Sequence, residues 1–239
     1  MNDITRRAYE MRKKEGLWKL LRQITRIGRF RLRRSFAHRE SNIYLIRIDP
    51  TEIKKCTPRP LVNRKKWNDL GLVVSGSWDQ WSSPDFSENI LYQSMQQHFI
   101  NDTSWDETTL YKTVLNEIDN FGHSYSYEGG YVDSESNLLS RCNSIEHLFE
   151  SIRTDGYKSQ LRQGAPEIDS IHPGESVPMI NEIMIDISRS GEPLFVDGKH
   201  RLSIAKILNL DSIPALVMVQ HANSPDLKFE ITSKIHLEI

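Results

Sequence analysis

Three cationic or potentially cationic side chains stand together near the end of this 239-residue chain, in the segment DGKHR at 197–201. A short apolar run at 194–196 precedes them, and apolar residues recur at helical spacing from Leu202 onward. The pattern predicts a strand, a turn and a helix that begins at Lys199. Because a helix N-terminus already carries partial positive charge, basic residues in its first turn indicate a bound anion, most often a phosphate.

Each residue of this turn has an expected role. Arg201 offers a planar fork that binds a phosphate through two hydrogen bonds, and Lys199 adds a point charge. His200 would orient the phosphate or donate to it, and Gly198 allows any backbone angle at the turn. Asp197 would cap the helix or face an acceptor hydroxyl. The alternative interpretation is a surface helix with a basic first turn that Asp197 simply caps.

Two carboxylates elsewhere are candidate metal ligands or general bases. Asp79 lies between two tryptophans after a predicted strand at 70–76. Its carboxylate would hold a metal or accept a proton from a substrate hydroxyl. The indole ring of one of the tryptophans would stack on a sugar or base. The alternative is a loop residue that caps the next helix. Glu182 begins a predicted strand at 182–187 and shares a face with Asp186, so either is a candidate magnesium ligand. The alternative is a pair of exposed carboxylates on an edge strand.

The 197–201 turn, the helix after it and the following Ile-Pro strand resemble the signature of the ParB/sulfiredoxin-like superfamily. The resemblance covers roughly 144–221, in which 144–156 resembles the helix that precedes the sheet of that fold and 181–196 resembles its hairpin. It implies a mixed α/β (α+β) domain whose turn holds a ligand. The superfamily includes CTP-binding DNA segregation proteins, ATP-dependent free serine kinases, sulfiredoxins and proteins described as nucleases.

Departures from the family pattern favour its kinase branch. Sulfiredoxins have a reactive cysteine where Lys199 stands, and an amine cannot perform their thiol chemistry. The DNA segregation proteins usually carry Gly-Glu-Arg-Arg and a following helix-turn-helix domain, whereas 18 residues follow His221 here. The resemblance therefore implies a phosphotransferase or nucleotide hydrolase that uses ATP or another nucleotide, Mg²⁺ and a small-molecule or glycan acceptor.

Two other interpretations stay open: a nucleic-acid-binding or nuclease protein, and a non-catalytic ligand-sensing module. The sequence contains no Gly-x-x-x-x-Gly-Lys-Ser/Thr loop, Gly-x-Gly-x-x-Gly, His-Glu-x-x-His or Gly-x-Ser-x-Gly motif. Phosphate binding therefore depends on the 197–201 turn or does not occur. The metal, if any, stays unknown at this level.

The first 40 residues form a basic segment, with 13 Lys and Arg against 4 Asp and Glu, so the other 199 residues carry a formal excess of 10 acidic groups. Residues 6–34 predict a basic amphipathic helix. Its apolar face consists of Leu17, Leu20, Leu21, Ile24 and Ile27. Three interpretations stay open: contact with an anionic membrane surface, docking on the acidic body through the same apolar face, or contact with nucleic acid.

The composition, 38% hydrophobic and 26% charged, is typical of globular domains, and no apolar run reaches the ~18 residues that span a bilayer. We expect a cytoplasmic protein, or one peripheral at the inner membrane face, with Cys56 and Cys142 as free thiols. The predicted organisation is a basic arm at 1–40, a mixed α/β region at 41–140 and a ParB/sulfiredoxin-like domain at 141–239. The clearest helices are predicted at 89–102, 104–120 and 144–153.

Overall fold

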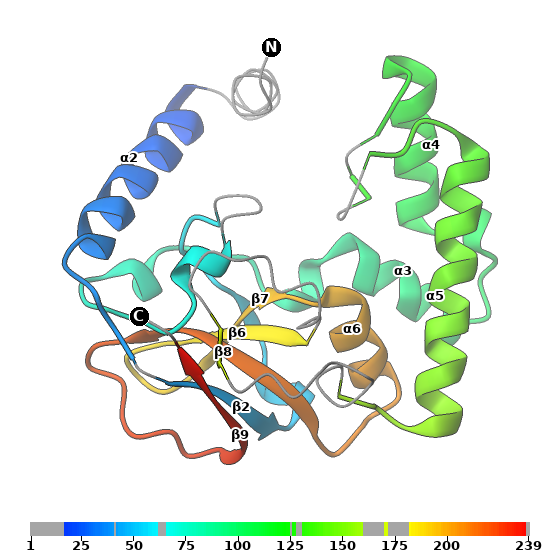
Figure 1. Cartoon of the computed structure of the whole chain (residues 1–239). Helices are drawn as coiled ribbons and strands as arrows, with labels where there is room; N and C mark the ends of the chain where they lie inside the picture. The colour runs from blue at the N-terminus through cyan, green and yellow to red at the C-terminus, as the bar shows by residue number, and fades with distance from the viewer. Residues whose placement is uncertain are drawn as a thin grey trace.

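The computed structural model describes residues 17–40, 42–61, 66–124, 126–127, 131–159, 170–171 and 182–237. It confirms a mixed α/β architecture (Figure 1). The helices are α2 (Leu17–Arg34), α3 (Ile90–Phe99), α4 (Thr109–Phe121), α5 (Glu135–Asp155) and α6 (Lys199–Ile207). The strands are β1 (His38–Arg39), β2 (Asn42–Ile48), β3 (Lys55–Cys56), β4 (Leu72–Val74), β5 (Ser170–Ile171), β6 (Ile183–Ile187), β7 (Pro193–Asp197), β8 (Ile213–His221) and β9 (Glu230–Leu237).

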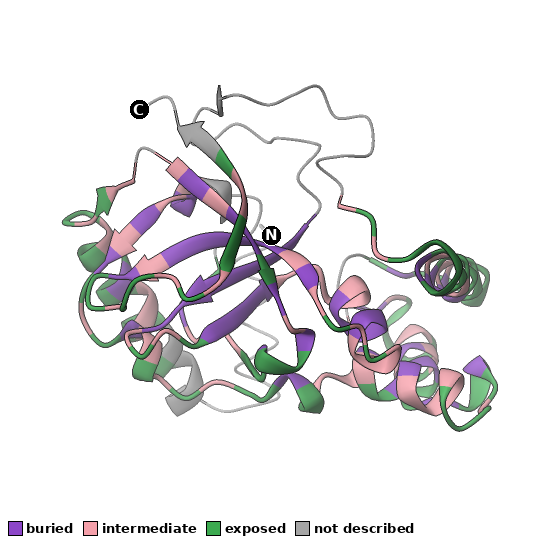
Figure 2. Ribbon diagram, turned by 90° about the horizontal axis from the view of Figure 1, so that it is seen from below, coloured by how far each residue is buried: buried purple, intermediate pink, exposed green. Residues whose placement is uncertain are grey.

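All the described strands belong to one mixed sheet. Its main path runs β3-β7-β6-β8-β2-β9-β5, with β4 added to β8 and β1 to β4. β6 and β7 form the predicted antiparallel hairpin, and β6 also runs parallel to β8. Since β6 and β8 have neighbours on both sides, their side chains are mostly buried, and Figure 2 shows buried residues concentrated along the middle of the sheet.

Helix α6 joins the sheet to a lobe formed by α3, α4 and α5. Leu202 and Ala205 pack in the apolar cluster of the sheet, together with Ile183 and Phe195. Ile204 packs instead among the apolar residues of α3, α4 and α5. Helix α2 lies on the other side of the sheet from this lobe in Figure 1. The first turn of α6 is therefore positioned where sheet and helical lobe meet.

The predicted division of the chain at residue 140 does not match the sheet. Strands β2 and β4, from the region 41–140, pair with β8, and β3 pairs with β7. Residue 140 itself lies inside α5, which begins nine residues before the predicted start at 144. The regions 41–140 and 141–239 thus share one sheet. Local apolar patterns predicted the strands but carry no information on their partners.

The interpretation of Glu182 and Asp186 as exposed carboxylates on an edge strand is wrong. Both side chains are buried, because β6 is an internal strand of the sheet. Asp186 forms an ion pair with the buried Arg59, whereas Glu182 lies at the pocket described below. The pairing of β6 with β7 shifts register between Met184 and Ile185, so simple alternation does not hold along this strand.

Two further expectations concern membranes and thiols. Within the described ranges, no helix combines the length and apolar character that crossing a membrane requires. Cys56 and Cys142 are free thiols, as the sequence predicts. Burial is the main reason that the pKa of Cys56 is raised to about 11 and that of Cys142 to about 12.

Candidate functional site

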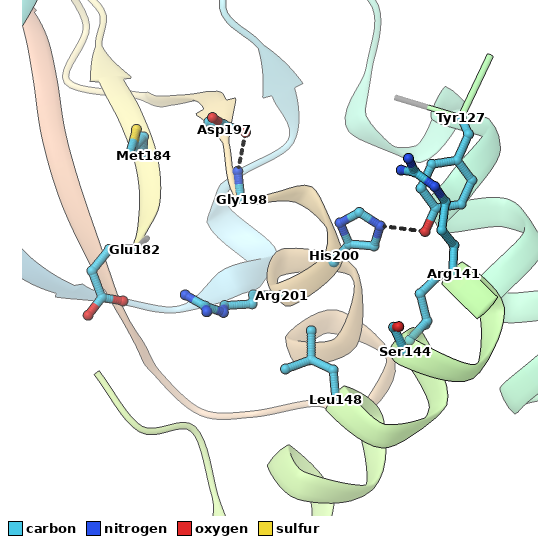
Figure 3. Close-up of a pocket in the computed structure, with 11 residues that line it drawn as sticks. Tyr127, Arg141, Ser144, Leu148, Glu182, Met184, Asp197, Gly198, His200 and Arg201 are labelled. Atoms are coloured by element: carbon cyan, nitrogen blue, oxygen red, sulfur yellow. Dashed lines mark hydrogen bonds between the residues drawn. The ribbon is translucent and has the colours of Figure 1, made fainter. Parts of the chain in front are cut away.

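A pocket of about 380 Å³ lies at the turn between β7 and α6 (Figure 3). Its walls come from four parts of the chain: the start of β6, the β7–α6 turn, helix α5, and the loop that contains Tyr127. The volume is within the range of small-molecule sites. Polar groups of the 197–201 turn and apolar side chains of α5 therefore face one space.

The turn depends on a left-handed glycine. Gly198 has a φ of +88°, and a Cβ there would lie 2.9 Å from the Cα of Ile183 and 3.2 Å from the carbonyl oxygen of Glu182. The Gly198 N–H donates to Oδ1 of Asp197 over 2.8 Å. Gly198, not Asp197, occupies the N-cap position of α6, and its cap has no side-chain hydrogen bond. The predicted capping role of Asp197 is therefore wrong, and its carboxylate instead stabilises the turn at the pocket wall.

Arg201 extends toward Glu182 across the pocket (Figure 3). Glu182 is only 1% exposed and accepts hydrogen bonds from Ser159 and, over 3.5 Å, from the Tyr157 hydroxyl. Burial raises the pKa of Tyr157 above its usual range, Glu182 adds to the rise, and Arg201 opposes it. The Arg201 guanidinium thus points toward a buried carboxylate, and its side-chain hydrogen bond to Tyr157 restricts its orientation before any ligand arrives.

His200 faces the helical lobe. Its Nε2 lies 3.2 Å from the Tyr127 hydroxyl, and Tyr127 stacks beneath the Arg141 guanidinium at 4.9 Å from the ring centroid. Burial, and then the charges of Lys199, Arg141 and Arg201, lower the pKa of His200 to about 4. The imidazole is therefore neutral near neutral pH. It connects α6 to the Tyr127 loop and can contribute hydrogen bonds to a ligand, but not a positive charge.

Two predicted site residues lie outside this pocket. Lys199 is absent from its walls. Burial lowers the pKa of Lys199 to about 7. Asp79 lies in the short 3₁₀-helix Trp78–Gln80, where it accepts hydrogen bonds from the backbone and guanidinium of Arg189. Arg189 belongs to the hairpin turn between β6 and β7, at the opposite end of β7 from the pocket, so Asp79 supports that turn.

Sequence reasoning missed Arg141 and Tyr127. Arg141 lies on α5, where its Nε donates to Asn137 over 3.0 Å and its Nη2 to the Tyr131 carbonyl over 3.2 Å. The predicted helix began at 144 and so excluded it. Ser134, whose hydroxyl accepts the Asn137 N–H, was the available N-cap signal for the longer helix. Nothing in the local sequence indicates that Arg141 meets the 197–201 turn.

The pocket walls contain two carboxylates, which bear on the expected magnesium ion. Among the described residues, no three His, Cys, Asp or Glu side chains gather at metal-binding positions. Glu182 and Asp197 do line the pocket together. Mg²⁺ is usually held by one or two carboxylates with substrate phosphates and water, so these are the two wall residues that would hold it.

Comparison of the chain with protein-family models, curated proteins and solved structures found no match. The resemblance to the ParB/sulfiredoxin-like superfamily therefore stays a prediction from the sequence.

Proposed function

We propose that the pocket binds a nucleotide through its phosphates and that the protein is a magnesium-dependent phosphotransferase or nucleotide hydrolase. The observation that supports this most is the meeting of two arginines, Arg141 and Arg201, with the N-terminus of α6 at one pocket. Arginine forks and unpaired helix N–H groups both favour phosphate oxygens. Within the described residues, the Arg141 guanidinium donates to the Asn137 side-chain amide and the Tyr131 carbonyl and forms no ion pair with a carboxylate.

The other wall residues suit the remaining parts of such a ligand. Ile145, Leu148 and Met184 supply apolar surface for a base or sugar. Asp197 would accept the proton of an acceptor hydroxyl or water, and Glu182 would share a magnesium ion with it. Magnesium, when bound, would neutralise charge on the phosphate oxygens. His200 would orient the ligand by hydrogen bonding, whereas Lys199 has no direct role in this proposal.

A second candidate is a non-catalytic nucleotide sensor that uses the same pocket. It is favoured by the fact that His200 and Asp197 each already have a protein partner, the Tyr127 hydroxyl and the Gly198 N–H. Such prior pairing suits selective binding without turnover. Turnover separates the two candidates, because release of phosphate or transfer to an acceptor requires the enzyme.

The first experiment compares Arg141→Ala with Arg153→Ala, a matched control on the same helix. Arg153 is exposed and pairs with Glu150, away from the pocket. A thermal-shift screen with ATP, CTP and GTP, each with and without Mg²⁺, selects the nucleotide, and calorimetric titration then measures its affinity. We expect Arg141→Ala to weaken binding about tenfold or more, since a charge-assisted hydrogen bond contributes roughly 1.5–3 kcal/mol. Equal affinity of the two folded variants would argue against the proposal.

Arg201 is tested with a double variant that removes one positive and one negative charge together. Arg201→Ala alone removes the hydrogen bond of Arg201 to the buried Tyr157 and a positive charge on the side of the pocket that faces Glu182, and we expect a loss of stability of about 1–3 kcal/mol that would obscure a loss of binding. Combining Arg201→Met with Glu182→Gln removes both charges together. We expect this double variant to fold and to bind nucleotide at least about tenfold more weakly than wild type. Wild-type affinity in the folded double variant would exclude Arg201 as a phosphate ligand.

A further inference from the structure

Helix α2 presents an apolar face to solvent. Leu21, Ile24 and Leu32 are 44%, 55% and 61% exposed, and Phe36, just after the helix, is 78% exposed. At 3.6 residues per turn, the spacings between the three helical residues place them within one narrow sector of the helix. Isolated exposed apolar residues are common, but a row of them along one helix face indicates a contact surface.

The body of the protein contacts the opposite face of α2. Phe30, nine residues and so about two and a half turns after Leu21, is buried edge-on against Trp78 with ring centroids 6.4 Å apart. Arg34 pairs with Asp69 at 2.6 Å, and Arg26 donates to the Ser82 carbonyl at 3.1 Å. Docking of the helix therefore leaves Leu21 and Ile24 of the predicted apolar face outward, whereas Ile27 is half-buried.

The charged residues around this apolar face are all basic. The α2 sequence contains seven Lys and Arg and no Asp or Glu, although the rest of the chain is acidic on balance. Arg22 and Arg29 are exposed on one side of the apolar row and Arg31 on the other. A partner must therefore combine an apolar interior with negative charge at its surface, which is the chemistry of an anionic lipid bilayer.

We propose that α2 lies in the headgroup region of an anionic membrane, with Leu21, Ile24, Leu32 and Phe36 inserted toward the acyl chains. Arg22, Arg29 and Arg31 would pair with lipid phosphates or carboxylates at either side. In Figure 1, α2 stands apart from α3–α5, so the helix can approach a surface without moving the nucleotide pocket. The proposal is independent of the proposed enzymatic activity. Residues 6–16 of the predicted amphipathic segment lie outside the described residues.

Vesicle co-sedimentation of the full chain tests this proposal. We expect sedimentation with vesicles of phosphatidylcholine plus phosphatidylserine and not with phosphatidylcholine alone. The variant Leu21→Ser, Ile24→Ser, Leu32→Ser should lower the partition coefficient roughly tenfold or more, because it removes the buried apolar area. The variant Arg22→Glu, Arg29→Glu should lower it at least roughly 25-fold, because each basic residue near an anionic surface contributes about a factor of five.

The matched control replaces three exposed apolar residues in or directly after other helices by serine: Ile100, Phe121 and Leu139. We expect this control to sediment like wild type, and circular dichroism checks that every variant folds. The proposal is overturned if the wild-type protein sediments with neither type of vesicle, or if the α2 serine variant sediments like wild type. A dimer in light scattering that only the α2 serine variant dissociates, without vesicle binding, would assign this face to a second copy of the chain.

Discussion

At the scale of single residues, the pocket depends on residues whose backbone conformation or side-chain orientation is fixed by contacts within the protein. Gly198 occupies a left-handed conformation against the backbone of β6, and Glu182 is buried at the pocket wall opposite Arg201. His200 is kept neutral by burial and by neighbouring cations. A ligand would therefore meet a site whose charges and hydrogen bonds are already oriented, which lowers the entropic cost of binding.

Gly198→Ala should lower the free energy of unfolding by about 2–3 kcal/mol, through left-handed strain and contact of the new Cβ with the Ile183 backbone. Gly28→Ala is the control, since a Cβ at Gly28 has no atom within 4 Å and α2 should gain up to about 1 kcal/mol. Urea denaturation followed by circular dichroism measures both. A Gly198→Ala protein as stable as wild type would show that the turn is not as described.

His200 should make stability depend on pH. Its pKa falls from 6.5 to about 4 on folding, so between these values the unfolded chain binds a proton that the folded chain does not. The free energy of unfolding therefore decreases as the pH falls through this window. His200→Gln should reduce that decrease by about 1–3 kcal/mol between roughly pH 7 and pH 4.5.

Urea denaturation at the two pH values provides the measurement for His200. The control is His147→Gln, because His147 is an exposed histidine on α5. An identical pH dependence in wild type and His200→Gln would mean that His200 is protonated in the folded protein at mildly acidic pH.

At the scale of elements, α6 is the connection between the sheet and the helical lobe. Leu202 and Ala205 face the sheet, and Ile204 faces α3 and α5. Any displacement of α6 would therefore move the first-turn residues His200 and Arg201 relative to Arg141 on α5. The geometry of the pocket therefore depends on how firmly α6 packs between the sheet and the helical lobe.

Ser203, in the middle of α6, offers a test of that packing. Its hydroxyl is buried and has no hydrogen-bond partner among the described residues. Ser203→Ala removes the unsatisfied group and raises helix propensity, so we expect a gain of about 0.5–1.5 kcal/mol in the free energy of unfolding. Thermal and urea denaturation measure this gain. A loss of similar size would show that the hydroxyl has a partner that stabilises α6.

At the scale of the whole molecule, a buried ionic network connects distant parts of the chain. Arg59 pairs with Asp186 of β6 and with Asp69, and Asp69 also pairs with Arg34 of α2. Thr57 donates a further hydrogen bond to Asp186. The orientation of α2 is therefore coupled to the internal strand whose first residue borders the pocket wall at Glu182.

Arg59→Met should lower the free energy of unfolding by about 3–5 kcal/mol, because it leaves the buried Asp186 without its cation. Adding Asp186→Asn should recover part of this loss, since the uncompensated charge disappears. Urea denaturation of wild type, single and double variants measures the coupling. Additive effects of the two substitutions would indicate that the ion pair contributes no coupling energy.

The sequence by itself predicted those features that depend on neighbours in the chain. The strand, turn and helix of residues 193–207 follow from an apolar run, a glycine and a helical repeat, and the structure confirms their order. The same holds for α3, α4 and the β6–β7 hairpin. Four residues of the 197–201 prediction, all except Lys199, also line the pocket because they belong to that one local unit.

Only the tertiary structure decided which distant residues join them. Arg141 reaches the turn because α5 packs near α6, and Asp79 is excluded because its own segment follows β4 to the other end of β7. Burial of Glu182 and the shared sheet of the regions 41–140 and 141–239 likewise arise from strand pairing between distant segments. Periodicity specifies which face of an element is apolar, but the partner of that face is chosen by packing of the whole chain.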